Sequence, residues 1–363
     1  MLSPFNFVLT SRSRSSNPAF GKEAPKVDVA RFHINGGIVK NNLSGFPHSM
    51  EMPPCMHCKA ADGEIFIPYA RGRLCPSCYI NFFERKVKRT VSKYRMIQEG
   101  DRVAVAVSGG KDSSSLMHAL KKTFPNVEFT GIYINLGIGG YSDECETILT
   151  DFLKKLEVDF IVYDVRKELG ISVEDFKRTY FKGRLCSPCG TIKRYLLNKI
   201  AYEEGFTKLA TGHNLDDLVE VLFNAYIHGD VSQLARIKPV LPSSHEKFVV
   251  KIKPLCELTE RENLLYAECS KIPYRTIACP LSARARSRRG KKVIDKIAES
   301  IPYFKHAFFK SHLKKLSRFF EPEASIHPIV ECKVCGMPSS TSPCAFCKRL
   351  QLVKEVNNRG RDD

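Results

Sequence analysis

Cysteines are the first residues in this chain whose spacing indicates chemistry. Eight of the fourteen cysteines form two sets of two Cys-x-x-Cys pairs; the pairs of the first set enclose 16 residues and those of the second enclose eight. No convincing signal peptide precedes them, and such spacing is typical of zinc held by four thiolates. We therefore predict two closed structural Zn²⁺ sites in place of disulfides, at Cys55, Cys58, Cys75 and Cys78 and at Cys332, Cys335, Cys344 and Cys347.

Three other cysteines suggest a different kind of site. Cys186 and Cys189 share the Cys-x-x-Cys spacing, and Cys279 stands alone before a proline. Three thiolates around an iron–sulfur cluster would leave one iron open, and soft ligands suit such clusters. The residues alone leave two alternatives, which are a redox dithiol with Cys279 buried, or a third zinc with an unidentified fourth ligand.

A glycine pair after a β-branched run indicates a phosphate-binding loop. Residues 103–107 lead directly into Ser108, Gly109, Gly110, Lys111, Asp112 and Ser113. Glycines let the backbone approach a phosphate, and the free N–H groups at the start of the next helix supply donors and positive potential. We expect Ser113 and Ser114 to cap that helix. The loop is not a Walker A motif, whose spacing is absent.

Two further loops are predicted to face the same crevice. Residues 135–141 hold a second glycine-rich turn, and residues 211–217 hold Gly212, His213 and two aspartates, Asp216 and Asp217. Each loop follows a predicted strand, and ligands of α/β proteins bind at the carboxyl ends of strands. The alternative is that His213 caps the helix and the aspartates only favour its positive end.

The elements that must position these loops alternate between strands and helices. Strands are predicted at 102–107, 127–134, 160–165, 208–211 and 248–253, and helices at 113–122, 143–156, 191–204, 215–228 and 260–271. This alternation favours an α/β fold with a parallel sheet covered on both faces. A basic amphipathic helix is expected from residue 79 to about residue 97.

The charge of the chain favours a polyanionic partner. There are 57 Lys and Arg against 39 Asp and Glu, a net charge of +18, and nucleic acid is the first candidate. A stretch without acids contains Arg284, Arg286, Arg288, Arg289, Lys291 and Lys292. We predict that it binds RNA together with Lys305, Lys310, Lys314, Lys315 and Arg318; the alternative is a solvated helix face. No apolar run reaches the length of a membrane span, so we expect a cytoplasmic protein without a membrane partner.

The loop Ser108–Ser113 resembles the PP-loop of the ATP pyrophosphatase superfamily, whose members cleave ATP between the α- and β-phosphates. The whole set of motifs, in its order, resembles the TtuA/NcsA group of tRNA 2-thiouridine synthetases over roughly residues 53–350. These motifs are the two zinc modules, Gly-Ile-Gly-Gly-Tyr, Cys-Ser-Pro-Cys-Gly, Gly-His-Asn-Leu-Asp-Asp and the lone Cys-Pro.

The resemblance implies a role for each motif. ATP is bound by Ser108, Gly109, Gly110, Lys111, Asp112, Ser113, Gly212 and His213, and the catalytic positions are Asp112, Lys193 and Asp217. Cys186, Cys189 and Cys279 are similar to the three ligands of an oxygen-sensitive 4Fe-4S cluster. Asp112 and Asp217 could hold Mg²⁺ or orient the substrate, and Lys193 could stabilise developing charge. The alternatives are a solvated lysine and helix-start carboxylates.

The resemblance also implies the reaction and the partners. A tRNA uridine is adenylated at its C2 oxygen, and sulfide bound to the open iron of the cluster then replaces that oxygen. The sulfur donor is free sulfide or a thiocarboxylated ubiquitin-like protein, and the family suggests a homodimer. Most motifs look closer to enzymes acting on the T-loop ribothymidine, whereas Gly229-Asp230 and Leu234-Ala235-Arg236 look closer to the wobble-uridine branch.

We therefore expect five segments along the chain. They are a disordered extension (1–52), an N-terminal zinc finger (53–78), a PP-loop ATP pyrophosphatase and sulfurtransferase domain (79–320) with a basic helical region (283–320), a C-terminal zinc ribbon (330–350) and a polar tail (351–363). A transit peptide or a misassigned start at Met50 or Met52 is the alternative for the first segment. The rival functions are a lysidine synthetase and a zinc-ribbon nucleic-acid-binding protein with a degenerate ATP domain.

Overall fold

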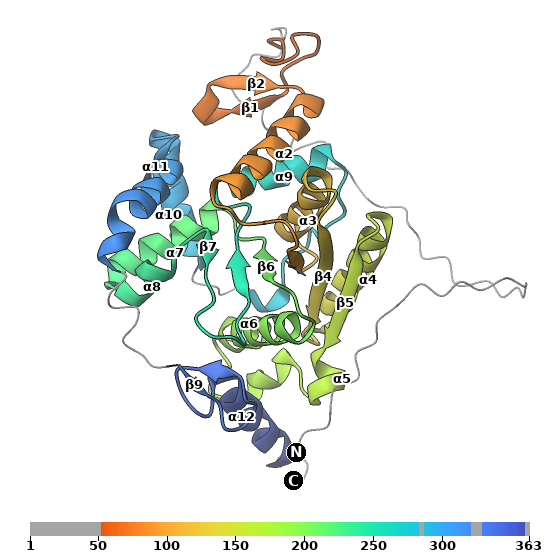
Figure 1. Cartoon of the computed structure of the whole chain (residues 1–363), viewed down its shortest axis with the longest axis vertical. Helices are drawn as coiled ribbons and strands as arrows, with labels where there is room; N and C mark the ends of the chain where they lie inside the picture. Colours follow the sequence, from red (N-terminus) through yellow and green to blue (C-terminus); the bar gives the residue numbers. More distant parts are fainter. Residues whose placement is uncertain (1–51, 283–286, 321–328, 360–363) are drawn as a thin grey trace, which may run out of the picture. The chain divides into compact units, whose positions relative to one another are not determined.

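The computed structural model describes residues 52–282, 287–320 and 329–359 (Figure 1). Residues 1–51, which hold nearly all of the expected extension, lie outside the described part. The chain divides into two compact units, Met1–Tyr79 and Ile80–Asp363. Among the described residues, no helix is long and apolar enough to cross a membrane.

The described part of the first unit is a small hairpin module. Strands β1 (Ile65–Ile67) and β2 (Gly72–Leu74) pair antiparallel, with Ile65 opposite Leu74. A single 3₁₀ turn joins them and ends at Arg71, which adopts a left-handed conformation with φ 47°. Helix α2 (Pro76–Lys93) begins one residue after Cys75, with proline at its first position, where the missing N–H costs nothing. The helix starts three residues before the start expected from the sequence.

The second unit is built on a six-stranded sheet with the order β5-β4-β3-β6-β8-β7. The first five strands in that order are parallel and β7 runs antiparallel to β8. Their bounds are β3 Arg102–Val107, β4 Glu128–Asn135, β5 Asp159–Asp164, β6 Lys208–Thr211, β7 Val240–Leu241 and β8 Val250–Ile252. The mostly parallel α/β fold is confirmed, and the two-residue β7 is the strand that the sequence did not predict.

Successive strands are added on one side of β3 and then on the other. Strands β4 and β5 lie on one side of β3, and β6, β8 and β7 lie on the other. Helices α3 (Lys111–Thr123) and α4 (Gly139–Lys155) connect β3, β4 and β5, and a Cβ on Gly131 of β4 would meet Met117 of α3 and Leu153 of α4. The chain then returns to β6 through α6 (Cys186–Glu203). Because such crossovers are right-handed, this return places α6 on the opposite face. The carboxyl ends of β3 and β6 therefore frame a switch point, where α/β sheets bind ligands.

Helix α6 begins five residues earlier than the sequence indicated. The expected start is residue 191, but Cys186 is the first helical residue, and Pro188 lies in the first turn, where it is tolerated. The short helices α5 (Val165–Leu169) and α8 (Val231–Arg236) were also not predicted.

Helices α7, α10 and α11 pack together, and a fourth helix, α9, packs on α3. Helix α7 (Leu215–His228) contacts both α10 (Ser287–Ser300) and α11 (Phe304–Ser311), and α9 (Glu260–Cys269) packs on α3. Asn214 caps α7 and Thr259 caps α9, each in a capping box with the acid three residues later. The described part of the basic region, residues 287–320, is helical as expected, ending in a π-helical turn (His312–Leu316) and a short 3₁₀ helix.

The last segment differs from the expected ribbon and polar tail. A short hairpin, β9 (Val330–Glu331) with β10 (Pro338–Ser339), is followed by helix α12 (Ala345–Arg359). The helix runs through most of residues 351–363, which the sequence predicted as a tail. Phe346 and Val353 of this helix are buried, so apolar packing stabilises it. The sequence did not predict the helix because most of its residues are polar.

Candidate active site

The phosphate loop is a tight turn between β3 and α3. Gly109 has φ +75°, and a Cβ there would lie 2.8 Å from the Sγ of Cys145, so only glycine fits. Ser113 Oγ accepts a hydrogen bond from the Ser108 backbone N–H (3.1 Å) and donates one to the Gly110 carbonyl (3.1 Å). The expected serine cap is therefore wrong, because Gly110 is the cap residue and no side chain caps the helix. The N–H groups of the first turn remain available to an anion.

The end of β6 packs directly on this loop. A Cβ on Gly212 would lie 3.1 Å from both the backbone N and the Cα of Ser113, so a larger residue would press on the first turn of α3. Nδ1 of His213 is hydrogen-bonded to Oγ1 of Thr211 (2.8 Å). Burial lowers the pKa of His213, so the imidazole is neutral near pH 7.

The two predicted magnesium ligands are held in different ways. Asp112 Oδ1 accepts hydrogen bonds from the side-chain amides of Asn214 (3.1 Å) and Asn263 (2.8 Å). Asp217 Oδ2 accepts a bond from the Asn214 N–H (3.2 Å), which is the helix-start role given as the alternative. Its other oxygen, Oδ1, is bonded to Lys291, so Asp217 serves the helix cap and faces the site at once.

These groups line one cavity of about 550 Å³. Most of the predicted site residues contribute to its wall, namely Ser108, Gly110, Asp112, Ser113, Cys189, Lys193, Gly212, His213, Asp217 and Cys279. Gly109, Lys111 and Cys186 do not line it. Lys111 instead bonds to Asp112 Oδ2 (3.0 Å) and Glu260 Oε1 (2.8 Å).

The cysteines reach the cavity from two segments of the chain. Cys189 and Lys193 lie one helical turn apart on α6 and share a face of that helix. The segment that carries Cys279 is fixed to the phosphate loop, because the Arg275 N–H donates to the Gly109 carbonyl (2.8 Å) and the Arg275 side chain bonds to Glu144 (2.8 Å).

The three cysteines predicted as cluster ligands lie in one region of the structure. Cys186 Sγ lies 3.8 Å from the carbonyl oxygen of Leu281, two residues after Cys279, so all three cysteines belong to one region. The three sulfurs lack the compact arrangement of the two four-cysteine sets among the described residues, and the 4Fe-4S cluster stays a prediction. Burial raises the pKa of Cys189, while the charge of Lys193 lowers it.

Three cations in the cavity wall were missed by the sequence reading. Arg194 follows Lys193 on α6, and Lys251 and Lys253 lie at the end of β8. Burial lowers the pKa of Lys253 to about 8, and its ammonium donates to the Lys238 carbonyl (2.5 Å). The available signal was the predicted strand at 248–253, whose carboxyl end carries both lysines, as the ends of β3 and β6 carry their ligand loops.

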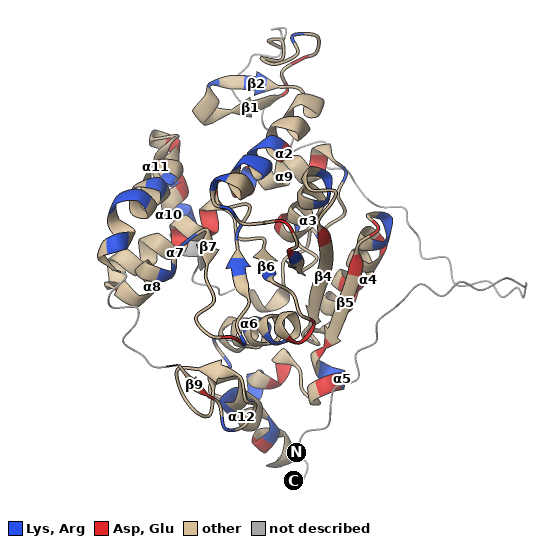
Figure 2. Cartoon of the chain, viewed as in Figure 1, with Lys and Arg blue, Asp and Glu red and all other residues tan. Residues whose placement is uncertain are grey.

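The predicted RNA-binding residues differ in how much of them the structure describes and in whether they are exposed or paired. Arg284 and Arg286 lie outside the described residues, and only the backbones of Arg288 and Arg289 are described, in α10. Lys292 is exposed, but Lys291 forms ion pairs with Asp217 (2.6 Å) and Glu260 (3.0 Å). Lys305 likewise pairs with Asp216 and Asp295. Both lysines are therefore committed within the protein. Lys and Arg recur along α2 and α11 (Figure 2).

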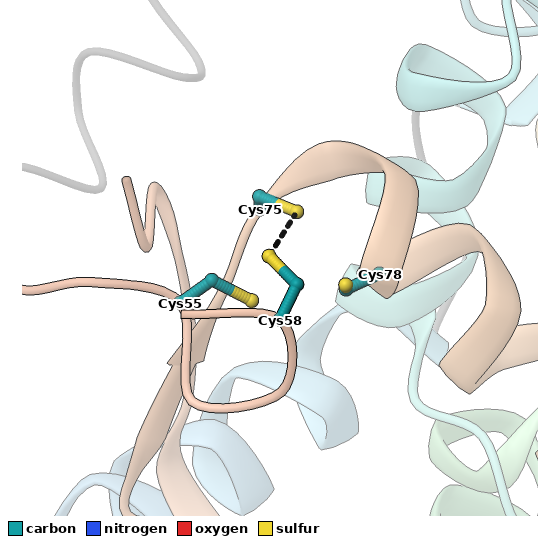
Figure 3. A group of neighbouring side chains, drawn as sticks. All are labelled: Cys55, Cys58, Cys75 and Cys78. Atoms are coloured by element: carbon teal, nitrogen blue, oxygen red, sulfur yellow. Dashed lines mark hydrogen bonds between the residues drawn. The ribbon is translucent and has the colours of Figure 1, made fainter. Parts of the chain in front are cut away.

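Each four-cysteine set forms a compact sulfur group. Four cysteines of the first unit converge in Figure 3. Cys55 and Cys58 come from the loop before β1, Cys75 follows β2, and Cys78 lies in the first turn of α2. In the second unit, the Sγ atoms of Cys332 and Cys347 lie 3.9 Å apart, and those of Cys335 and Cys344 3.8 Å apart. A tetrahedron with Zn–S bonds of about 2.3 Å has edges near this length. Disulfide sulfurs would lie about 2 Å apart, so both sets fit zinc.

A phosphate loop at the switch point of a parallel sheet, joined in one cavity by carboxylates and a lysine, defines a nucleotide-binding α/β domain. A family model described as a PP-loop domain matches residues 81–278. A "tRNA-5-methyluridine(54) 2-sulfurtransferase" of Pyrococcus horikoshii is 40% identical over 304 residues, covering 83% of this chain and 96% of the relative. Its counterpart in Thermus thermophilus is 35% identical and covers 79% and 92%.

A solved structure agrees with these relatives. The "U34-tRNA thiolase NcsA from Methanococcus maripaludis with its [4Fe-4S] cluster" is similar with a TM-score of 0.69 and 29% identity, covering 82% of this chain and 96% of that one. The chain belongs to the TtuA/NcsA-type family of PP-loop tRNA sulfurtransferases. The family resemblance expected from the motifs is confirmed.

Proposed function

We propose that this protein is an ATP-dependent tRNA sulfurtransferase that converts the T-loop 5-methyluridine at position 54 to its 2-thio form. One observation carries the proposal, which is that a single cavity brings together the phosphate loop, Lys193, Asp217, Cys189 and Cys279. Three curated relatives at 34–40% identity are named for position 54.

The residues of the cavity suit the activation step. The N–H groups of the first turn of α3 receive ATP phosphates, and the C2 oxygen of the base attacks the α-phosphorus as pyrophosphate leaves. Asp112 and Asp217 would hold Mg²⁺, which supplies charge neutralisation for the phosphates. Lys193, together with Lys251 and Lys253, places positive charge where negative charge accumulates.

The cysteines at the cavity suit the sulfur step. Cys186, Cys189 and Cys279 would hold a 4Fe-4S cluster, which when bound supplies an open, Lewis-acidic iron for sulfide. A sulfide nucleophile then forms the C2–S bond, the C2–O bond breaks and AMP departs with the oxygen. Lys193 lies one turn from Cys189 and can stabilise the charge on the departing AMP.

The partners of the reaction follow from the same chemistry. The exposed cations of α11 and the turns after it, Lys310, Lys314, Lys315 and Arg318, are the described residues best placed for tRNA phosphates. We propose free sulfide or a thiocarboxylated ubiquitin-like protein as the donor, two Zn²⁺ in the cysteine modules, a homodimer and a cytoplasmic location.

Mass spectrometry of nucleosides from tRNA of a deletion strain tests this function. The expected result is loss of 2-thio-5-methyluridine with 2-thiolated wobble uridine retained. The solved thiolase acts on U34 and shares 29% identity with this chain, so wobble thiolation is the second candidate. Loss of the wobble product alone would establish that candidate and refute the T-loop assignment.

A further inference from the structure

One carboxylate joins the phosphate loop to the basic helix α10. Glu260 Oε1 accepts a hydrogen bond from Lys111 Nζ (2.8 Å), and Glu260 Oε2 accepts one from Lys291 Nζ (3.0 Å). Lys111 belongs to the loop and Lys291 to α10. Glu260 is the first residue of α9, and it carries no role in the expected site.

The two lysines also contact the two predicted magnesium ligands. Lys111 bonds to Asp112 Oδ2 (3.0 Å) and Lys291 to Asp217 Oδ1 (2.6 Å). The order of contacts is therefore Asp112, Lys111, Glu260, Lys291, Asp217. Glu260 lies at the centre of this chain, and a ligand carboxylate lies at each end.

The surrounding structure fixes both sides of Glu260. Its backbone N–H donates to Asp216 Oδ2 (2.8 Å) at the start of α7. On the other side, α10 approaches α7 closely at Gly290, where a Cβ would lie 3.3 Å from the Cγ of Glu220. This close approach places Lys291 between Asp217 and Glu260.

We propose that Glu260 is a positioning residue for adenylation, and this inference rests on the proposed function. Its negative charge draws Lys111 and Lys291 toward itself, so that neither ammonium fully neutralises Asp112 or Asp217. Both aspartates then stay available to the magnesium ion that accompanies ATP. Burial alone would raise the pKa of Glu260, but the bonds and charges of the two lysines lower it to about 2, so the carboxylate stays charged.

The inference gives Lys291 a different role from the one its sequence suggests. A lysine on a phosphate-binding surface contributes to the affinity for tRNA and to its salt dependence. A lysine held by Asp217 and Glu260 contributes instead to the geometry of the activation site. Measurements on Lys291 therefore separate the two roles.

Pyrophosphate release with saturating tRNA, measured against Mg²⁺ concentration, tests the proposal in the full-length protein. Glu260→Gln is expected to raise the half-saturating Mg²⁺ and to lower kcat about tenfold, with an unchanged Kd for tRNA. Lys291→Met is expected to alter the Mg²⁺ dependence as well, and the effects of the two substitutions should not add, because they act on one chain of contacts. Calorimetric binding of Mg²⁺–ATP gives a readout that is independent of turnover.

Lys296→Met is the matched control, because Lys296 is an exposed lysine on the same helix. It should leave the Mg²⁺ dependence unchanged. If Lys291→Met weakens tRNA binding and lowers the salt slope by about one, with normal Mg²⁺ dependence, the proposal is wrong and Lys291 is a phosphate contact. The proposal is also wrong if the wild type is active and Glu260→Gln gives the same result as the wild type in every measurement. A wild type that releases no pyrophosphate with tRNA refutes the proposed function itself.

Discussion

Tyr195 of α6 and Phe346 of α12 stack with ring centroids 3.8 Å apart and ring planes 6° apart. The C-terminal cysteine module is thereby packed on the helix that carries Cys186, Cys189 and Lys193. Arg349 of α12 reinforces the contact, since it donates to Ser187 Oγ (3.2 Å) within the first turn of α6. The module thus supports the start of the helix that carries two of the proposed cluster ligands, Cys186 and Cys189.

Removing the stacked ring should therefore loosen the cluster ligands. Phe346→Ala leaves a cavity at a buried aromatic site and is expected to destabilise the protein by about 3 kcal/mol. Thermal unfolding and the iron content per chain measure the effect, and both should fall while ATP binding persists. Phe319→Ala, at a ring that is 65% exposed, is the control. Normal iron content in a clearly destabilised Phe346→Ala protein would contradict the supporting role.

ATP binding should weaken at mildly alkaline pH. Lys253 faces the cavity, and burial lowers its pKa to about 8, so its charge is present below pH 8 and is lost as the pH rises through that value. An ordinary lysine would stay charged to about pH 10.4. We expect the Kd for Mg²⁺–ATP to rise several-fold between pH 7 and pH 9.5, and Lys253→Met to bind weakly with no such dependence. Equal dependence in both proteins would assign the titration to another group.

Zinc should stabilise each cysteine module separately. We expect two zinc ions per chain by elemental analysis, since both sulfur groups match a tetrahedral site. Cys75→Ser should lose one zinc and unfold residues of the first unit, because small modules depend on metal to fold. Proteolysis would report the unfolding, with Cys269→Ser as the control. A fully protected Cys75→Ser protein that keeps both ions would refute the assignment.

The surface that binds tRNA should be found on the exposed cations after α10. Replacing Lys310, Lys314, Lys315 and Arg318 with glutamine removes four charges that no described ion pair holds. The affinity for tRNA is expected to fall, and the slope of log K against log salt concentration should flatten by up to about four units. Filter binding at several salt concentrations measures both. An unchanged slope would place the interface elsewhere.

The parts of the site that the sequence predicts are those that need a particular residue type at a particular position. Gly109 has a positive φ, the phosphate loop follows a β-branched strand, and the cysteine pairs have ligand spacing. These local signals predict the strands, the loop and both sulfur groups. The sheet order, in contrast, depends on contacts between distant residues, and β7 is too short to have a periodic pattern.

The pairing of Lys291 could not be read from the sequence. Residues 284–292 contain no acid, which indicates a surface for phosphates, but Asp217 and Glu260 come from two other helices that pack beside α10. Local charge patterns carry no information about such partners. Lys251 and Lys253 were missed for a related reason, since the strand was predicted correctly but the cavity at its end depends on α6 and β6.

The two halves of the reaction should separate by mutation. Cys279→Ser is expected to lose iron and thiolation while keeping ATP and tRNA binding, because Cys279 is a proposed cluster ligand and not part of the phosphate loop. Asp112→Ala should keep iron and lose tRNA-dependent pyrophosphate release, since its carboxylate lies at the phosphate loop. Iron analysis and pyrophosphate assays under anaerobic conditions measure this. If both variants lost iron and pyrophosphate release to the same extent, the two steps would not be separable.

Anaerobic thiolation of purified tRNA by the purified protein tests the central claim most directly. With ATP, Mg²⁺ and sulfide, the wild type should form 2-thio-5-methyluridine at position 54, located by mass spectrometry of nuclease fragments. Omission of ATP, exposure to air or the Cys279→Ser substitution should each abolish the product. Normal thiolation by an aerobically purified, iron-free Cys279→Ser protein would contradict the account and leave a dithiol at Cys186 and Cys189 as the sulfur carrier.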